Sequence, residues 1–412
     1  MSFIRTNCRA IPKEDKIFAL NGRAGEMINR EGEGKVINAT IGTLLDDEGR
    51  LMILDSVQQV YKELKGEDFA PYAPIGGLPG FKESVKKALF KGRKSSRFIE
   101  ISSTPGGTGA IRNAVANYSD SGDSLLTADW FWSPYKTICN ELGRQLETYK
   151  LFDKDGRFNL GDFERRVLML LRRQENLCII LNTPAHNPTG YTIKEREWDS
   201  IVSILNKVAA KEAKRIVLFV DVAYIDFAKP EEADVFLPKL EDLNDRVLPL
   251  IGYSASKTFT MYGMRCGAIV CMAKDEKTTE EFVSAMEYSA RGTWSNCNRS
   301  AQTIIEKIFN EEELLKRVDR EREGCRKMLL RRGKVFEETA LKLNLPIVPF
   351  DSGFFACISC NKPSFVSSLL EGEGVFAVPL EKGLRFSVAS INEDKIVRSV
   401  KATAKIFQEK DV

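Results

Sequence analysis

The chain has one histidine, His186, among 412 residues, and this scarcity argues against two common kinds of catalytic site. A Ser-His-Asp triad and a His-rich zinc site both need imidazoles that the sequence hardly supplies. The nine cysteines are an odd number scattered along a long chain, which does not indicate a disulfide framework. Cys357 and Cys360 have CxxC spacing but fall in an apolar, strand-like stretch, so we interpret them as ordinary thiols. We therefore expect no metal site.

The sequence also lacks an excess of charge and a long apolar run. It has 61 basic and 58 acidic residues, a formal net charge of +3, which gives no electrostatic case for binding nucleic acid or an anionic membrane. No segment approaches the ~18–20 apolar residues that a membrane helix needs. The first residues, Met1 to Asn7, lack the apolar core of a secretory signal. We therefore expect a cytoplasmic protein with no nucleic-acid or membrane partner.

From residue 97 onward, a short apolar stretch, a polar or glycine-rich turn and a helical pattern recur along the chain. This alternation predicts an α/β fold with a largely parallel, doubly wound sheet. The expected strands are Phe98–Ser102, Ser124–Ala128, Gln145–Leu151, Leu177–Leu181, Ile216–Val220, Val247–Tyr253 and Gly267–Met272.

The chain changes character after this region. Residues 311–343 are highly charged with apolar positions at helical spacing, which predicts a long amphipathic helix with Gly333 as a candidate break. Short strands and helices follow it, in an α+β pattern, at Phe354–Ile358, Ser364–Glu371, Leu384–Val388 and Asn392–Gln408. At this length, one large and one smaller domain are expected. We predict a large domain over residues 46–312 and a small α+β domain formed by residues 1–45 and 313–412.

The stretch around which the chain is organised is Ser254-Ala-Ser-Lys257, directly after the apolar strand Val247–Tyr253. In open α/β sheets, ligands bind outside the carboxyl ends of the strands. A lysine delivered there can be partly desolvated, which lowers its pKa and makes the amine a nucleophile toward carbonyls. Hydroxyl groups at Ser254 and Ser256 and the guanidinium of Arg265 lie in the same stretch. This grouping suits an anionic ligand, most simply a phosphate.

Other motifs follow neighbouring strands. The turn at Gly106-Gly107-Thr108-Gly109 ends a strand and opens a helix, where backbone N–H groups form an anion site. Asp221 ends an apolar strand, where a carboxylate is costly unless it meets a cation or a donor. With the aromatic Trp132 and the donors Asn187 and Tyr224, these groups meet the needs of pyridoxal 5'-phosphate (PLP): a lysine for its aldehyde, an acid for its ring nitrogen and a cup for its phosphate.

The ordered set of motifs resembles fold-type I PLP-dependent aminotransferases of class I/II, and most closely the aspartate and aromatic amino acid branch. The resemblance runs from Ile41-Gly42 to Gly383-Leu-Arg385-Phe386, nearly the whole chain. It rests on Tyr72 with Gly77-Leu-Pro79, Thr104–Ala110, Trp132, Asn187-Pro-Thr-Gly190, Asp221-x-Ala-Tyr224, Ser254-x-Ser-Lys257, Arg265, Arg291-x-x-Trp-Ser-Asn296 and Arg385. It implies the PLP-dependent transferase fold, with a mostly parallel seven-stranded sheet in the large domain.

The resemblance also implies a role for each matched residue. Lys257, Asp221 and Tyr224 would be catalytic: Lys257 would bond the cofactor and move protons, and Asp221 would keep the ring nitrogen protonated. The residues that would bind the cofactor are Tyr72, Gly106, Gly107, Thr108, Trp132, Asn187, Asp221, Tyr224, Ser254, Lys257, Arg265 and Ser295. The residues that would bind substrate are Gly42, Trp132, Asn187, Arg291 and Arg385. Of these, Arg385 would take the α-carboxylate.

Three of these residues, Tyr72, Arg291 and Ser295, match positions that reach in from a neighbouring subunit in the family, so a homodimer with shared sites is expected. The sequence departs from the family elsewhere. Aspartate members usually carry histidine where this chain has Tyr135, and another histidine where it has Asn182. After Arg291, a tyrosine and a proline are replaced by Trp294 and Cys297-Asn298. These changes leave PLP binding in place but put substrate identity in question.

We predict an aminotransferase that moves the amino group of aspartate or an aromatic L-amino acid to a 2-oxo acid such as 2-oxoglutarate by a ping-pong mechanism. Two alternatives stay open. A PLP-dependent C–S β-lyase would share the same framework and release pyruvate and ammonia. A non-catalytic PLP-binding regulatory module is the other. The lack of a DNA-binding segment before residue 40 and the intact set of Lys257, Asp221 and Arg385 argue against it.

Overall fold

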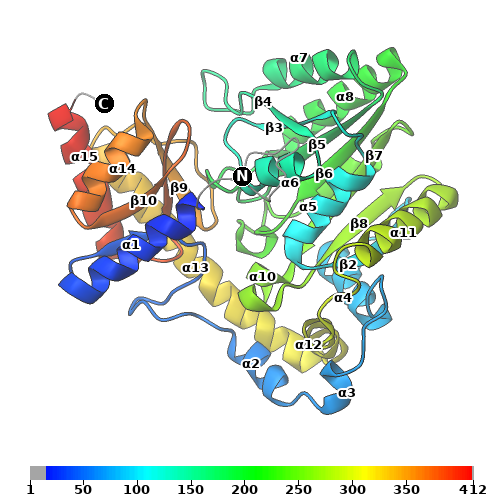
Figure 1. The fold of residues 1–412 in the computed structure, drawn as a ribbon, viewed down its shortest axis with the longest axis horizontal. Helices are drawn as coiled ribbons and strands as arrows, with labels where there is room; N and C mark the ends of the chain where they lie inside the picture. The colour runs from blue at the N-terminus through cyan, green and yellow to red at the C-terminus, as the bar shows by residue number, and fades with distance from the viewer. Residues whose placement is uncertain (1–14, 411–412) are drawn as a thin grey trace, which may run out of the picture.

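The computed structural model describes residues 15–410, and these residues are organised around two sheets (Figure 1). The larger sheet has seven strands in the order β2-β8-β7-β6-β5-β3-β4. They are β2 (Phe98–Thr104), β3 (Ser124–Ala128), β4 (Gln145–Tyr149), β5 (Asn176–Asn182), β6 (Arg215–Asp221), β7 (Val247–Ser254) and β8 (Gly267–Ala273). Only β8 runs antiparallel to its neighbours, β2 and β7. The predicted mostly parallel seven-stranded sheet is confirmed.

Apolar side chains lie on both faces of this sheet, and helices cover both. Along β6, Leu218 and Val220 join one core cluster, while Val217 and Phe219 join another on the opposite face. The first face packs against α4 (Pro79–Phe90), α7 (Leu160–Leu171) and α8 (Glu195–Glu212). The second packs against α5 (Gly106–Asn117), α6 (Pro134–Glu141) and α11 (Glu276–Arg291). With both faces buried, the carboxyl edge is the side of the sheet left for a ligand.

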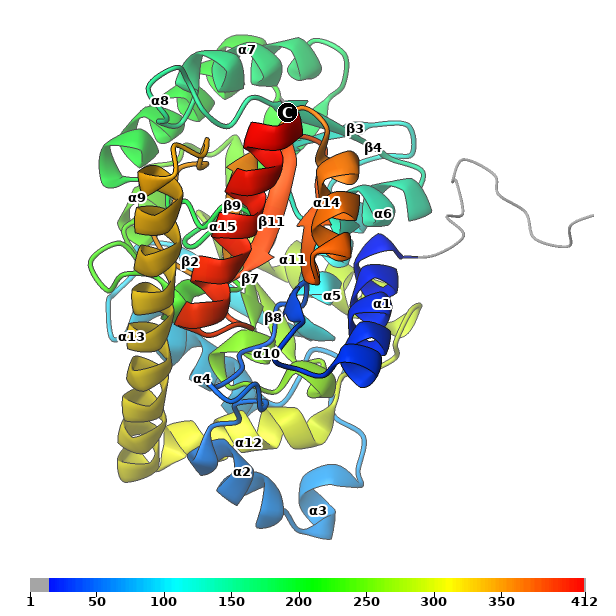
Figure 2. The same ribbon diagram turned by 90° about the vertical axis from the view of Figure 1, so that its left-hand side faces the viewer.

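The smaller sheet has four strands in the order β1-β10-β11-β9. They are β1 (Ile37–Ala39), β9 (Phe355–Ser359), β10 (Val375–Pro379) and β11 (Gly383–Ser387). Around it lie α1 (Lys16–Glu31), α14 (Pro363–Gly372) and α15 (Glu393–Lys410), which Figures 1 and 2 show on the side away from the larger sheet. The parallel pairing of β1 with β10 brings the N-terminal region into a sheet otherwise built from C-terminal residues. The domain limits at 45/46 and 312/313 stay a prediction.

A single helix, α13 (Glu312–Lys342), runs from the large-sheet side to the small-sheet side (Figures 1 and 2). Its 31 residues give a length of roughly 46 Å at 1.5 Å per residue. The suggested break at Gly333 is wrong, because the helix continues through it. A Cβ at Gly333 would lie 2.5 Å from the Phe350 ring, so the glycine serves the close approach of Phe350.

Next to Gly333, the side chain of Arg332 is fully buried and joins three segments of the chain. Its Nη1 donates to the backbone oxygens of Leu45 at 2.9 Å and Ala389 at 3.1 Å, and its Nη2 pairs with Asp47 at 2.8 Å. A buried guanidinium is stable only when its donors and its charge are met. The segment around residues 45–47 is therefore fixed against both α13 and the loop after β11.

The remaining elements are short and connect those above: α2 (Asp55–Lys62), α3 (Gly66–Phe69), α9 (Phe236–Glu241), α10 (Ala255–Thr258), α12 (Arg299–Asn310) and the 3₁₀ turns η1 (Ile225–Phe227) and η2 (Tyr262–Met264). Within residues 15–410, no helix combines the length and the apolar character needed to cross a membrane.

Candidate active site

Lys257 lies on α10, which begins where β7 ends, so the sheet delivers its amine to the carboxyl edge as predicted. Its Nζ donates to the backbone oxygen of Gly42 at 2.5 Å. The rings of Tyr262, Phe354 and Tyr224 surround it, with centroids 4.7, 5.5 and 5.8 Å from Nζ. The amine therefore sits among aromatic rings at the edge of the sheet.

Burial, together with the nearby charges of Arg265 and Arg385, lowers the pKa of the Lys257 amine from 10.5 to about 7. A charged amine is disfavoured where water is scarce and other cations are close. Near neutral pH the Lys257 amine is therefore neutral in a large share of the molecules. The neutral amine is the form that attacks a carbonyl carbon.

Asp221 ends β6 and is 5% exposed. Its Oδ2 accepts a hydrogen bond from the Tyr135 hydroxyl at 2.6 Å, and its Oδ1 accepts one from the backbone N–H of Ala223 at 3.2 Å. Asn182 holds the backbone here, since its Nδ2 donates to the Asp221 carbonyl oxygen at 3.0 Å. Burial raises the pKa of Asp221 to about 6, and these hydrogen bonds oppose the rise. A cationic partner would stabilise this carboxylate further.

Arg385 on β11 is 4% exposed, although the part of the chain that the structure describes gives it no carboxylate partner. Its Nη2 donates to the Thr40 carbonyl oxygen at 2.7 Å, and its Nη1 reaches Asn187 Oδ1 at 3.4 Å. Asn187 Nδ2 in turn donates to the Tyr224 hydroxyl at 3.3 Å. The guanidinium lies 4.3 Å from the centroid of the Phe355 ring, and its Nε is buried without a hydrogen-bond partner among the described residues.

Burial lowers the pKa of Arg385, which shows how poorly its charge is compensated. A guanidinium with unused donors in a water-poor place is suited to a bidentate bond with a carboxylate ligand. The structure thus places three predicted residues, Asn187, Tyr224 and Arg385, in one connected group.

The predicted phosphate cup is also assembled. The first turn of α5 holds Gly106, Gly107 and Thr108. A Cβ at Gly106 would collide with the Arg265 guanidinium, and a Cβ at Gly107 would lie 3.4 Å from Ser254 Cβ. Arg265 Nη1 is oriented by Ser256, whose Oγ accepts its hydrogen bond at 3.0 Å. A helix N-terminus facing a guanidinium and a hydroxyl is a good site for a phosphate dianion.

Trp132, the predicted stacking residue, is half-buried and meets Tyr135 edge to face, with ring centroids 5.6 Å apart. It thus lies beside the tyrosine that bonds Asp221. Gly42, predicted to bind substrate, contributes the carbonyl oxygen that contacts Lys257. A Cβ at Gly42 would lie 2.5 Å from the Phe355 ring, so glycine is needed for the close approach of this segment.

Tyr72, Arg291 and Ser295 lie apart from this buried group. Tyr72 is 87% exposed, and Arg291, also exposed, donates through Nη1 to Ser295 Oγ at 2.7 Å. Within residues 15–410, none of the three has a hydrogen bond or ion pair with Lys257 or Asp221. The structure therefore does not bring them into the site of the same chain.

Sequence reasoning missed several side chains close to Lys257 and Arg385. Tyr262 is five residues beyond Lys257 and contacts it through the ring, while its hydroxyl accepts a hydrogen bond from the Leu44 N–H at 3.1 Å. Phe354 and Phe355 looked like ordinary strand residues in the sequence. Tyr135 and Asn182 were noticed only as departures from the family. An aromatic residue shortly after the lysine was the one signal that pointed to Tyr262.

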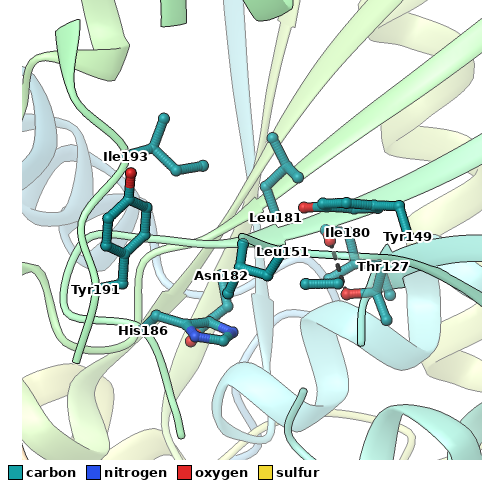
Figure 3. A pocket seen from close by; sticks show the side chains of 10 residues that line it. Thr127, Tyr149, Leu151, Ile180, Leu181, Asn182, His186, Tyr191 and Ile193 are labelled. Atoms are coloured by element: carbon teal, nitrogen blue, oxygen red, sulfur yellow. Dashed lines mark hydrogen bonds between the residues drawn. The ribbon is translucent and has the colours of Figure 1, made fainter. Parts of the chain in front are cut away.

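A small cavity lies behind this site, around Asn182 and His186 (Figure 3). Its volume is about 10 Å³, near the lower limit for one water molecule and too small for an amino acid. His186 is buried, its Nδ1 lies 2.8 Å from Thr189 Oγ1, and burial lowers its pKa to about 3. The single histidine of the sequence is therefore buried in the turn after β5, where burial favours its neutral form.

The residues present fit PLP. The cup at α5 offers donors for a phosphate, Lys257 offers an amine with a lowered pKa, and Asp221 offers a buried carboxylate that has no ion pair within residues 15–410. Arg385 supplies a separate anion site. When bound, PLP supplies an electron-withdrawing ring that stabilises negative charge on the α-carbon of an amino acid.

Comparisons with known proteins agree with this geometry. The profile of the family described as aminotransferase class I and II matches residues 34–402. The chain is 27% identical to an aromatic-amino-acid aminotransferase of Paracoccus denitrificans, over 93% of this chain and 94% of that protein. It is 26% identical to an aspartate aminotransferase of Escherichia coli K12, over 89% and 91% of the two chains.

Among solved structures, that of an aminotransferase from Anaerococcus prevotii is similar to it with a TM-score of 0.95 and 34% identity, covering 98% of this chain and 99% of the other. The fold, the match over nearly the whole length and the assembled site lead to one conclusion. The chain belongs to the aminotransferase class I and II family and is a PLP-dependent aminotransferase of fold type I.

Proposed function

We propose that the enzyme transfers the amino group of aspartate or an aromatic L-amino acid to a 2-oxo acid such as 2-oxoglutarate, in a ping-pong cycle. We also propose that it works as a homodimer with shared active sites, in the cytoplasm. The observation that carries the proposal is the buried guanidinium of Arg385, which has free donors and no carboxylate partner among residues 15–410. Amino acids and 2-oxo acids share a carboxylate next to the reacting carbon, so both half-reactions can use it.

Each buried residue has a defined task in this proposal. Arg385 and Asn187 orient the substrate carboxylate, because their hydrogen bond fixes the guanidinium of Arg385 against the loop that follows β5. Tyr224, whose hydroxyl accepts a hydrogen bond from Asn187, would supply a hydroxyl to hold the ring oxygen of the cofactor. Asp221 keeps the ring nitrogen protonated. Lys257, with its lowered pKa, accepts and returns the proton of the α-carbon.

The contacts of Thr40 and Gly42 explain how the site stays ordered before substrate arrives. Their carbonyl oxygens accept hydrogen bonds from Arg385 and Lys257, the two basic side chains to which this proposal gives roles in binding and proton transfer. We infer that an incoming carboxylate replaces the neutral carbonyl of Thr40 on Arg385, because two opposite charges attract each other in a way that a neutral carbonyl cannot match.

The distal part of the substrate is assigned to Arg291, acting from the partner subunit. This assignment is supported by the exposure of Arg291 and Tyr72. Neither side chain lies in the buried site of its own chain, so both are accessible to a partner subunit. In a dimer, Arg291 would bind the second carboxylate of aspartate or 2-oxoglutarate. An aromatic donor would not need it.

The test is a half-reaction screen. Single amino acids are added to the PLP-loaded enzyme, and the absorbance of the cofactor is followed as it takes up the amino group. We expect conversion with aspartate or an aromatic amino acid, and its reversal by 2-oxoglutarate. Release of pyruvate and ammonia from cysteine-type substrates, with no reversible exchange, would instead establish the β-lyase. No conversion with any amino acid would support the regulatory module.

A further inference from the structure

The carboxylate of Asp221 is held by Tyr135, which stands where aspartate members of the family usually carry a histidine that supports this aspartate. Tyr135, 1% exposed on α6, places its hydroxyl 2.6 Å from Oδ2 of Asp221. The two residues are 86 positions apart in the sequence. The ring of Tyr135 is fixed edge to face against Trp132, so the hydroxyl has little freedom to turn away.

The groups around Asp221 are otherwise uncharged. The residues opposite it on the neighbouring strands are Asn182 and Gly252. Tyr135 and Tyr224 are the titratable side chains whose charge bears on it, and both stay neutral because burial raises their pKa values. Within residues 15–410, Asp221 has no ion pair with a lysine, arginine or the single histidine.

We propose that Tyr135 is the positioning residue that keeps Asp221 ionised and aimed at the ring nitrogen of the cofactor, and that it does so with a donor that does not titrate in the working pH range. Histidine, usual at this position in aspartate members of the family, changes charge between about pH 5 and 8. A tyrosine hydroxyl at 2.6 Å stabilises the carboxylate equally at either end of that range.

Asn182 completes the support from the other side. Its Nδ2 donates to the backbone oxygen of Asp221, and its Oδ1 accepts from the backbone N–H of Asn187 at 2.6 Å. The Asn182 amide thereby sets the spacing between Asp221 and Asn187, two residues predicted to bind the cofactor. Tyr135 controls the charge of Asp221, and Asn182 controls where its backbone lies.

The inference rests on the proposed role of Asp221, so the experiment must separate the two. Enzyme variants are loaded with PLP carrying ¹⁵N in the ring, and the ¹⁵N chemical shift, which reports protonation of that nitrogen, is followed from pH 5 to 9. The variants are Tyr135→Phe, Tyr135→His, Asp221→Asn and, as a matched control, Tyr149→Phe. Tyr149 is a buried tyrosine that packs on Phe158 and Phe163.

In Tyr135→Phe, we expect the ring nitrogen to lose its proton about 1 to 2 pH units lower than in the wild type. A hydrogen bond to a charged group contributes roughly 1.5–3 kcal/mol, which corresponds to that displacement. The same loss predicts a kcat lowered about 10- to 100-fold with KM little changed. Tyr149→Phe should titrate as the wild type does.

Tyr135→His keeps a donor, and we expect it to retain ring protonation at high pH while adding a titration step between about pH 5 and 8. It also serves as the deciding variant if Tyr135→Phe does not fold. A wild-type titration in Tyr135→Phe, or in Tyr135→His where only that variant folds, would overturn the role of Tyr135. If Asp221→Asn also keeps the ring protonated, then the role proposed for Asp221 itself fails.

Discussion

Arg385 and Arg291 are the two arginines proposed to hold substrate carboxylates, and the chain treats them in opposite ways. Arg385 is 4% exposed and bonded to Thr40 and Asn187. Arg291 is exposed at the end of α11 and bonded only to the nearby Ser295 among the described residues. Folding alone builds the first site, because the small sheet carries Arg385 to the carboxyl edge of the large one. The second is completed, in our proposal, by a partner chain.

Substitutions in the buried site around Arg385 and Lys257 should lower activity more than a substitution at the exposed Arg291. The largest effect is expected for Lys257. Lys257→Ala removes both the amine that bonds the cofactor and the base proposed for the α-carbon proton. General acid–base catalysis alone contributes 10²–10⁴-fold, so we expect kcat to fall on the order of 10³-fold or more. Single-turnover absorbance measurements would show it. Turnover within tenfold of the wild type would contradict this assignment.

Arg385→Ala should have the next largest effect. Removing one partner of a desolvated charge pair costs roughly 2–5 kcal/mol, and about 1.4 kcal/mol corresponds to a tenfold change. We therefore expect kcat/KM to fall at least about 30-fold for every amino donor and every 2-oxo acid. Steady-state kinetics with aspartate, phenylalanine and 2-oxoglutarate provide the measurement. A loss confined to dicarboxylates would assign Arg385 to the distal carboxylate instead.

Arg291→Ala should separate substrates that Arg385→Ala affects alike. We expect a loss of about 30-fold for aspartate and 2-oxoglutarate, and a much smaller loss for aromatic donors, which have no second carboxylate. Equal losses for both classes would remove Arg291 from specificity.

Mixed dimers sharpen the same comparison. When inactive Lys257→Ala chains are combined with Arg291→Ala chains, which should be weakened toward dicarboxylates, a shared site predicts that each hybrid dimer regains about one fully competent site for aspartate. The measurement is activity of purified hybrids carrying two different affinity tags. Hybrids that form but stay inactive would place both residues in the site of one chain.

The smallest expected effect is on the stability of the cofactor-free protein. The pKa of Lys257 falls from 10.5 to about 7 on folding, so between these values the unfolded chain binds more protons and the free energy of unfolding rises with pH. For Asp221 the pKa rises from 3.8 to about 6, so stability falls as pH increases through that window. Each slope is at most about 1.4 kcal/mol per pH unit.

Urea unfolding across pH 4–10 would reveal both slopes, with Lys257→Met and Asp221→Asn as controls. Each control should abolish its own slope and leave the other. If the wild-type slope above pH 7 survives in Lys257→Met, then another group is responsible for it.

Much of the fold could be predicted because buried parallel strands are continuous apolar runs, and all seven strands of the large sheet were expected within a few residues of where they lie. The strands β1 and β10 were missed. β1 has only three residues, too few to show a period, and the two strands pair across 338 positions. A local sequence pattern can indicate a strand, but it cannot show that β1 pairs with a strand 338 positions away, because that pairing forms only when the small sheet assembles.

The candidate site shows the same limit. Lys257 and Asp221 were predictable because each stands at the end of an apolar strand, where a polar side chain demands a reason, whereas Arg385 was predicted from the family resemblance. The carbonyl of Gly42 beside Lys257, 215 residues away, carries no side-chain signal at all. In the sequence, Tyr135 is only a departure from the family pattern. Its hydrogen bond to Asp221 depends on the fold, which brings together two residues 86 positions apart.

The buried contacts of Arg332 limit how this chain can be shortened or rearranged. Since one guanidinium binds Leu45, Asp47 and Ala389, a truncation beginning after residue 47 removes an ionic partner from a fully buried charge. Such a protein would lose β1 and would also carry an uncompensated cation in the middle of α13. Circular permutation that keeps residues 37–47 attached elsewhere should be tolerated better than their deletion.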